Sequence, residues 1–294
     1  MDFQTIPIED ISLRERYHLM TGVVFPRPIA FVSSINAEGQ PNLAPFSYFN
    51  MFSSQPPVAI FAPAVSGRSG ENKDTYFNVV SQGEVVINLV SHEIVEQMVL
   101  TSGEFAPEVN EWEKSGLTPL ASQLVKPARV AESPVQLECR VMKVDSLGTE
   151  GGAGNLVYCE VLRMHIKADA IDEQLKVDPR ALDLVGRLGG AWYTRANGDA
   201  LFQVMRPSTS CLGFDGLPKA IRESTALTGN EIAHIANQEM LPTMENATQV
   251  LVKAGEDVNR FVNNLPEAEN YAKARIPEDR QDLALAALIV ALGK

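Results

Sequence analysis

The sequence predicts a mainly β fold, a closed or nearly closed barrel with short helices, followed by a helical C-terminal extension. Between residues 29 and 204, short apolar and β-branched runs alternate with turn-forming residues, as in small barrels. The helical crossovers that a parallel sheet needs between successive strands are mostly missing there. After Arg206 and Pro207 helix signals dominate. We therefore predict a barrel domain at residues 1–206 and a helical extension at residues 207–294.

The first strands are expected to be short. Residues 29–34 are apolar and β-branched, which predicts a strand. Further strands are expected at residues 43–52 and 58–62. Pro56 and Pro57 lie between these two, and because proline donates no backbone hydrogen bond, they prevent one continuous strand.

Short helices are expected beside the next strand. One helix is predicted to run towards Ser81, since Asp74 or Thr75 can cap its first turn. Residues 84–90 predict a strand and residues 91–101 a helix.

Two long strands are expected at residues 135–144 and 155–166. In the first, apolar and polar residues alternate, so Gln136 and Glu138 should share the face opposite the apolar one. The glycine-rich residues 148–154 between them suit a flexible hairpin tip. They superficially resemble a nucleotide-binding loop, but they do not open a helix, which argues against a dinucleotide-binding fold.

The C-terminal extension carries helix signals of its own. Thr228 with Glu231 fits a capping box ahead of an apolar helix face. Further helices are expected at residues 243–265 and 278–292. The apolar run within the last helix is shorter than the roughly 20 residues that cross a bilayer, so we expect it to pack on protein.

The charge of the chain limits its partners. With 37 acidic and 25 basic residues, the formal net charge is −12. A protein that binds nucleic acid through the phosphate backbone needs a basic face, so this balance argues against DNA, RNA and anionic membrane surfaces. Small anionic ligands need only a local cluster of donors and are compatible with it.

The cysteines indicate a reducing compartment. Cys139, Cys159 and Cys211 are odd in number and far apart, and none forms a C-x-x-C pair. The first 20 residues contain no apolar run typical of a secretory signal. We therefore predict free thiols, no metal site and a cytoplasmic location.

Residues 66–75 form the most informative segment. They combine hydroxyls and cations with two glycines that allow a close backbone approach, and they lead directly into a predicted helix start. A helix N-terminus carries unpaired N–H groups and partial positive charge, which suits a phosphate. The alternative is a solvated loop that ends in a helix cap. The side chains concerned are Ser66, Arg68, Ser69, Lys73 and Thr75.

Two other segments carry features of a binding site. Arg27 lies between prolines, so its stiff backbone reduces the entropy lost when the side chain engages an anion. An ordinary surface arginine is the alternative. Residues 42–50 are almost continuously apolar and aromatic, which suits either a buried strand or the edge of a flat heteroaromatic ligand.

Together these segments resemble the flavin reductase-like family, whose fold is the FMN-binding split barrel. The resemblance covers about residues 15–206. The family is typically homodimeric, with FMN near the subunit interface. The motifs that carry the resemblance are PRPIAFVSS at 26–34, NLAPFSYFN at 42–50, NKDT at 72–75, and GRLGG at 186–190 with Trp192 and Tyr193 after it.

The resemblance implies roles for the matching residues. The FMN phosphate would be held by Ser66, Arg68, Lys73 and Thr75, with Arg27 as a further contact. The isoalloxazine would be lined by Pro45, Phe46, Ser47 and Tyr48, and the main-chain N–H groups around Phe46–Tyr48 would stabilise the reduced flavin. Asp74 would cap the helix or orient Lys73, and Tyr193 would stack near the flavin or the nicotinamide.

The function implied is hydride transfer from NAD(P)H to FMN, either to supply a separate monooxygenase or to reduce another acceptor such as a ferric chelate. The alternative is a non-catalytic FMN-binding module that transfers electrons or senses redox state. No catalytic side chain is assigned. We interpret His165 as a hydrogen-bonded strand histidine, with a position facing the flavin or nicotinamide as the alternative.

Overall fold

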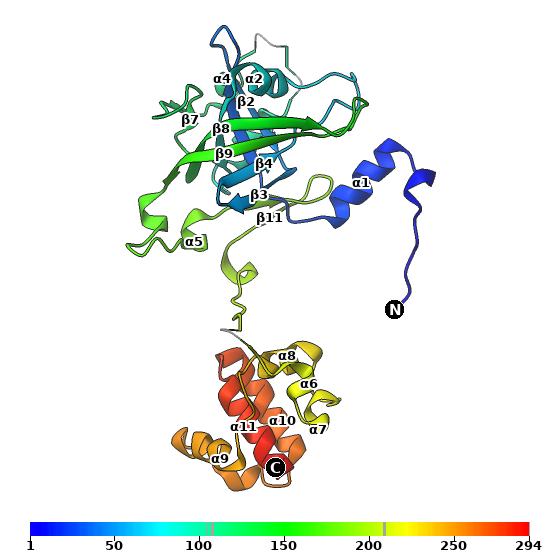
Figure 1. The fold of residues 1–294 in the computed structure, drawn as a ribbon, viewed down its shortest axis with the longest axis vertical. Coiled ribbons are helices and arrows are strands. Elements are labelled where there is room, and N and C mark those ends of the chain that lie inside the picture. The colour runs from blue at the N-terminus through cyan, green and yellow to red at the C-terminus, as the bar shows by residue number, and fades with distance from the viewer. Residues whose placement is uncertain (104, 107–108, 208–209, 294) are drawn as a thin grey trace. The chain divides into compact units, whose positions relative to one another are not determined.

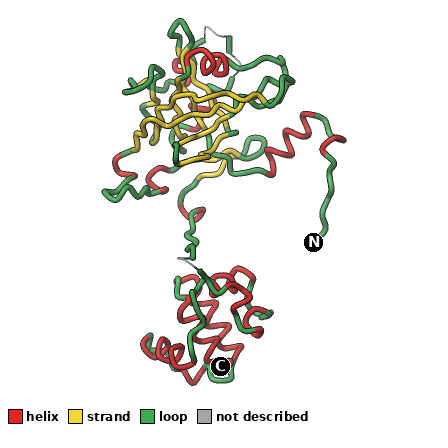
Figure 2. Tube along the Cα trace, in the orientation of Figure 1, coloured by secondary structure: helices red, strands yellow, loops and turns green. Residues whose placement is uncertain are grey.

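The computed structural model describes residues 1–103, 105–106, 109–207 and 210–293. These form two compact units, residues 1–202 and residues 203–294 (Figure 1). Figure 2 shows the strands of the described residues gathered in the first unit, while the second consists of helices and loops.

The first unit is built on one seven-stranded antiparallel sheet. Its strand order is β2-β1-β5-β8-β9-β4-β3, so half of the neighbouring pairs, β1–β5, β5–β8 and β9–β4, join strands that are not consecutive in the chain. The strands are β1 (Ala30–Ile35), β2 (Pro41–Phe46), β3 (Phe49–Ser54), β4 (Pro57–Phe61), β5 (Glu84–Leu89), β8 (Val135–Ser146) and β9 (Asn155–Ile166).

The sheet closes almost completely into a barrel. β2 and β3 lie at opposite edges of the sheet, yet only Ser47 and Tyr48 separate them in the chain. The sheet must therefore curl until its two edges nearly meet. The prediction of one strand over residues 43–52 was wrong, because the chain leaves one edge at Phe46 and enters the other at Phe49.

Alternating side chains fill the barrel and cover its outside. Apolar residues of six strands and of helix α2 (Asp74–Gln82) form the interior, including Val32, Ile87 and Phe61. The opposite faces of β1 and β2 pack through Phe31 and Leu43 against α3 (Val95–Leu100) and α4 (Glu111–Ser115). Period-two alternation thus serves two cores, one on each side of the same strands.

The start of α2 differs from the prediction. Its N-cap is Lys73, in extended conformation, and no side chain caps the helix by accepting a hydrogen bond from its first turn. Asp74 is therefore the first helical residue, not the cap. Thr75 is 1% exposed, and its hydroxyl accepts a hydrogen bond from Asn42 of β2 at 2.9 Å.

Two further expectations were only partly right. α3 begins at Val95 and not at residue 91, because Ser91 forms a β-bridge with Leu184. The polar face expected on β8 does not reach solvent at its start, where Gln136 is 6% and Glu138 0% exposed.

Smaller elements of this unit are η1 (Ile8–Asp10), α1 (Leu13–Val23), β6 (Pro119–Leu120), β7 (Arg129–Val130), η2 (Ala168–Ala170), α5 (Pro179–Leu182), β10 (Val185–Arg187), β11 (Tyr193–Arg195) and η3 (Gly198–Ala200).

The second unit packs its helices around α11 (Gln281–Leu292). Residues 283–291 are buried without interruption, as expected for a helix that is apolar on all sides. The capping box of Thr228 and Glu231 is confirmed at the start of α8 (Gly229–Ala236). The other elements are α6 (Gly213–Gly216), α7 (Lys219–Arg222), α9 (Met244–Lys253), η4 (Val258–Arg260), α10 (Leu265–Arg275) and η5 (Ile276–Glu278).

The single helix predicted at residues 243–265 was wrong. α9 ends at Lys253, and Gly255 follows in a left-handed conformation with φ of 79°. The last predicted helix, expected from residue 278, begins at Gln281. Among the described residues, no helix has both the length and the apolar character needed to span a membrane.

Candidate functional site

The segment at residues 66–75, here called the 66–75 loop, folds around one serine. The Ser66 hydroxyl oxygen accepts hydrogen bonds from the backbone N–H groups of Arg68 and Ser69, both at 3.2 Å. The Ser66 N–H donates to the Glu71 carbonyl at 2.8 Å, and the Gly70 N–H donates to the Ser66 carbonyl at 2.9 Å. Gly70 has φ of 75°, which favours glycine. The Ser66 side chain thus shapes the loop.

The cations of this loop are exposed. Arg68 and Lys73 both lie on the surface, and Lys73 immediately precedes α2. The Tyr76 N–H donates to the Lys73 carbonyl at 2.9 Å, so the N–H groups of Asp74 and Thr75 are the donors that this end of α2 adds, together with the partial positive charge of the helix N-terminus. Asp74 is also exposed and is the first residue of α2.

The far end of the loop is tied to the barrel by buried polar side chains. Asn42 of β2 donates from its amide to the hydroxyls of Thr75, at 2.9 Å, and of Ser34, at 3.2 Å. Asn78 of α2 donates to the same Ser34 hydroxyl at 3.0 Å. Sequence reasoning did not single out Asn42 as a partner of this loop, although it stands first in the NLAPFSYFN motif.

The residues predicted to line a flavin ring lie where the barrel is split. Pro45 pairs with Phe31 of β1, and Phe46 is buried with its ring centroid 5.4 Å from that of Phe61. Ser47 and Tyr48 lie outside both strand ladders, so their N–H groups take no part in strand pairing.

Tyr48 projects partly into solvent. Tyr48 is 40% exposed. Burial of the phenol raises its pKa, Tyr17 raises it further, and the positive charge of Arg27 opposes both. The Tyr48 carbonyl accepts from the Ala62 N–H at 2.8 Å, which holds the turn between β2 and β3 against the end of β4.

Arg27 is buried and bonded to protein. Its guanidinium donates to the carbonyls of Thr21 at 2.7 Å, Val24 at 2.5 Å and Leu188 at 3.0 Å. Its Nε donates to the Ser47 hydroxyl at 3.4 Å. Four of the five N–H groups of the side chain therefore have protein acceptors, and Arg27 joins the end of α1, the turn after β2 and the GRLGG segment.

The GRLGG segment lies beside Arg27 through its backbone as well. Arg27 and Arg187 exchange two backbone hydrogen bonds, at 3.0 and 2.8 Å. Tyr193 of β11 pairs with Arg187, whose guanidinium carbon lies 4.5 Å from the centre of the tyrosine ring. The structure thus brings together Arg27, Ser47 and Tyr193 from three motifs. Arg187 was overlooked, although it stands in one of them.

Strand β2 connects the two groups of candidate residues. Asn42 bonds Thr75 of the 66–75 loop, and Ser47 follows the other end of the strand beside Arg27. At about 3.3 Å per residue, the five steps between them span roughly 16–17 Å.

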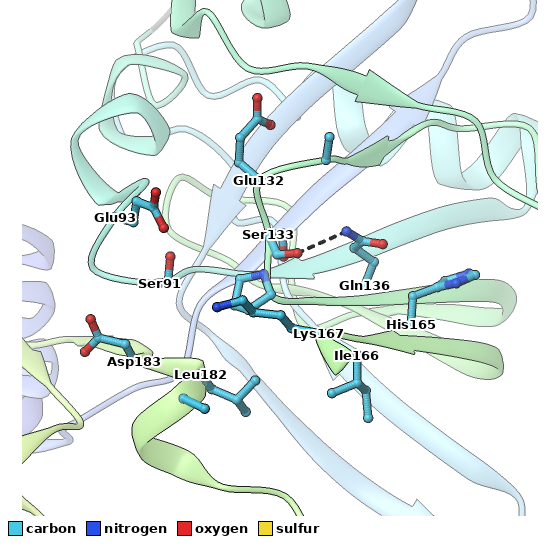
Figure 3. A pocket seen from close by; sticks show the side chains of 13 residues that line it. Ser91, Glu93, Glu132, Ser133, Gln136, His165, Ile166, Lys167, Leu182 and Asp183 are labelled. Atoms are coloured by element: carbon cyan, nitrogen blue, oxygen red, sulfur yellow. Dashed lines mark hydrogen bonds between the residues drawn. The ribbon is translucent and has the colours of Figure 1, made fainter. Parts of the chain in front are cut away.

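A separate pocket of about 460 Å³ lies at the ends of β8 and β9 (Figure 3). None of the predicted flavin residues lines it. His165 and Gln136 face each other across the two strands there. His165 Nε2 lies 2.7 Å from Glu138 Oε1, so the interpretation of His165 as a hydrogen-bonded strand histidine is confirmed.

The family match with known proteins lies within the first unit. The sequence model of the flavin reductase like domain matches residues 20–184. An uncharacterized protein of Aquifex aeolicus is 40% identical over 189 residues, 64% of this chain and 93% of the relative. An uncharacterized protein of Halalkalibacterium halodurans is 35% identical over 204 residues, 69% of this chain and 96% of the relative.

Two similar solved structures have named activities. Nitrilotriacetate monooxygenase component B from Bacillus cereus is 29% identical, with a TM-score of 0.65 over 69% of this chain and 100% of its own. The 2-nitrobenzoate 2-nitroreductase of Pseudomonas fluorescens is 30% identical, with a TM-score of 0.63 over 74% of this chain and 100% of its own. The family match ends at residue 184, so the C-terminal unit lies outside it.

Proposed function

Because this chain belongs to the flavin reductase like domain family, we propose that it is an FMN-binding oxidoreductase in which NAD(P)H reduces the flavin. One observation supports FMN in particular: Asn42, near the start of β2, bonds Thr75 of the cationic loop, and Ser47, about 16–17 Å farther along the extended chain, begins the open turn. That span is comparable to an extended FMN molecule. The barrel, residues 1–206, would be the catalytic domain.

The 66–75 loop fits a phosphate group. Arg68 and Lys73 would neutralise the dianion through charge-assisted hydrogen bonds, and the first-turn N–H groups of α2 would add donors. The Ser66 hydroxyl oxygen already accepts from two backbone N–H groups, and the Thr75 hydroxyl oxygen accepts from Asn42. Each hydroxyl would therefore donate a hydrogen bond to the phosphate through its O–H.

The turn between β2 and β3 would hold the flavin ring. Pro45 and Phe46 would lie under it, and the N–H groups of Ser47 and Tyr48 would donate to its polar edge. Bound FMN would supply the redox chemistry by accepting a hydride from the nicotinamide. The chain would orient both molecules, and donors preorganised by the Arg27 guanidinium would favour the negative charge of the reduced ring. Tyr193 would stack beside one of them.

We also propose a homodimer, as is typical of the family. In the first unit, α1 exposes Leu13, Tyr17, Met20 and Val23, and β3 exposes Met51 and Phe52. Contiguous exposed apolar side chains are typical of interaction surfaces. Since Tyr48 immediately precedes β3, a dimer built on this strand would place the flavin ring near the interface.

The electron acceptor would be free flavin for a partner monooxygenase. The similarity to a monooxygenase component B supports this role. We place the enzyme in the cytoplasm, where NAD(P)H is available and where its three free cysteines would stay reduced.

The proposal is tested by adding NADH or NADPH anaerobically to purified protein with FMN. Bleaching of the flavin absorbance that is catalytic in protein is the expected result. A protein that binds FMN but does not speed its bleaching would instead be the non-catalytic module. A protein with no affinity for FMN would refute both.

Lys73→Ala tests the phosphate site. Loss of a charge-assisted hydrogen bond should cost about 1.5–3 kcal/mol, so FMN should bind roughly 10- to 100-fold more weakly. Arg68→Ala should act in the same direction. Lys126→Ala, an exposed lysine outside the site, is the control and should leave the affinity unchanged. Unchanged affinity in both test variants would exclude this loop as the phosphate site.

A further inference from the structure

The glycine-rich tip of the β8–β9 hairpin, residues 147–155, packs on the 66–75 loop. We propose that this tip positions the loop and so makes the protein select phosphorylated flavin over riboflavin. The inference rests on the proposed function, because it needs the loop to bind the flavin phosphate.

Backbone hydrogen bonds join the tip to the segment that enters the loop. The Val65 N–H donates to the Ala153 carbonyl at 2.8 Å, and the Gly152 N–H donates to the Val65 carbonyl at 2.9 Å. Ala64 and Gly154 form a β-bridge. The residues before Ser66 therefore continue a short ladder with the hairpin tip.

Asn155, the first residue of β9, bonds both the segment that enters the loop and the loop itself. It is 2% exposed, and its amide donates to the Pro63 carbonyl at 3.1 Å and to Asn72 Oδ1 at 2.9 Å. Its own Oδ1 accepts from the Ser146 hydroxyl at 2.6 Å, which fixes the orientation of the amide. One buried side chain thus ties Pro63, three residues before the loop, to Asn72 within it.

Gly151 lies so close to the loop that a Cβ would fit only if the loop backbone moved. A Cβ at this position would lie 3.1 Å from the Gly67 Cα and 3.2 Å from the Ser66 carbonyl oxygen, both of them backbone atoms. At Gly148, in the same hairpin, a Cβ would meet only the Ala153 methyl group, at 3.4 Å. Neither glycine needs a left-handed conformation. Alanine at position 151 would therefore require the Ser66–Gly67 backbone to move by a few tenths of an ångström, whereas alanine at position 148 would not.

These contacts matter for affinity because they order the loop before a ligand arrives. A loop that is already folded around Ser66 loses little conformational entropy on binding, so more of the phosphate interaction appears as affinity. The flavin ring would lie at the turn after β2, and among the described residues no backbone hydrogen bond joins this turn to the tip. Damage to the tip should therefore weaken binding of the phosphate without weakening binding of the ring.

The test compares FMN with riboflavin, which lacks the phosphate, by titrating flavin fluorescence. Gly151→Ala and Asn155→Ala should each weaken FMN binding by about tenfold and change riboflavin binding less than twofold. Gly148→Ala is the matched control for the first variant. For the second, the control is Asn88→Ala, because Asn88 is a fully buried barrel asparagine that donates to the Phe31 carbonyl.

The outcomes separate the two levels of the argument. If the wild-type protein binds FMN and riboflavin equally well, the phosphate site itself is wrong. If the wild-type protein prefers FMN but Gly151→Ala and Asn155→Ala keep that preference, or lose both ligands in parallel, the positioning role is wrong. Tryptophan fluorescence identifies a variant that fails to fold, and the other variant then decides.

Discussion

Replacing Arg27 by alanine should destabilise the first unit strongly. The substitution removes four donated hydrogen bonds and leaves the carbonyls of Thr21, Val24 and Leu188 without their partner. Each buried unsatisfied group costs about 1–3 kcal/mol, and water would reach part of the space that the guanidinium vacates. We therefore expect the free energy of unfolding of this unit to fall by about 3–5 kcal/mol.

Urea unfolding followed by tryptophan fluorescence measures this loss. The two tryptophans of the chain, Trp112 and Trp192, both lie in the first unit, so the signal does not depend on the second. Arg163→Ala, an exposed arginine on β9, is the control and should change stability by less than about 0.5 kcal/mol. A loss below about 1 kcal/mol in Arg27→Ala would refute the reasoning, because the three carbonyls would then be satisfied without the guanidinium.

Three further substitutions probe buried and capping groups. Burial raises the pKa of Glu138, but hydrogen bonds from the Gln123 and Leu124 N–H groups and from His165 lower it more, so its net pKa is lowered. Its stabilisation is therefore present above the unfolded pKa and is lost as pH falls through the folded one. Glu138→Gln should cost about 1–3 kcal/mol at pH 7 and flatten the acid limb of a stability–pH profile; an unchanged profile would contradict this. Burial raises the pKa of Glu111, so its ionised form is disfavoured in the folded state. Glu111→Gln should therefore raise the free energy of unfolding at pH 7 by about 0.5–1 kcal/mol. A lower free energy of unfolding in a urea titration would contradict this. Thr228→Ala removes the capping box of α8 and should lower the free energy of unfolding of the second unit by about 1 kcal/mol. Far-UV circular dichroism should detect this loss, and tryptophan fluorescence should not. A shift of the fluorescence transition would count against independent unfolding of the two units.

Local patterns in the sequence were sufficient for most elements of the barrel. The strand predicted at residues 155–166 is β9, and the one predicted at 84–90 is β5 within one residue. The capping box at Thr228 was readable because the side chain and its partner lie three residues apart. Such features depend on neighbours in the chain, so the sequence alone determines them.

The candidate site was predicted as a set of motifs, not as an arrangement. The family resemblance assigned Ser66, Lys73 and Ser47 to one ligand, and those assignments remain predictions. Nothing in the motifs indicated that Asn42 would bond Thr75, or that Arg27 would be engaged by backbone carbonyls. The partners of these side chains come from other elements, and a local pattern cannot name them.

Tertiary structure decided where the barrel is split and what supports its loops. The extended chain is interrupted at Ser47 and Tyr48 because β2 and β3 belong to opposite edges of the closed sheet. Arg27 reaches a carbonyl 161 residues away, and Asn155 reaches Asn72 across 83 residues. The sequence alone indicated most strands and helices, through periodicity and capping, but not the breaks after Phe46 and Lys253. The close approach of distant segments was decided only when the whole sheet closed, because their contacts form only in the packed barrel.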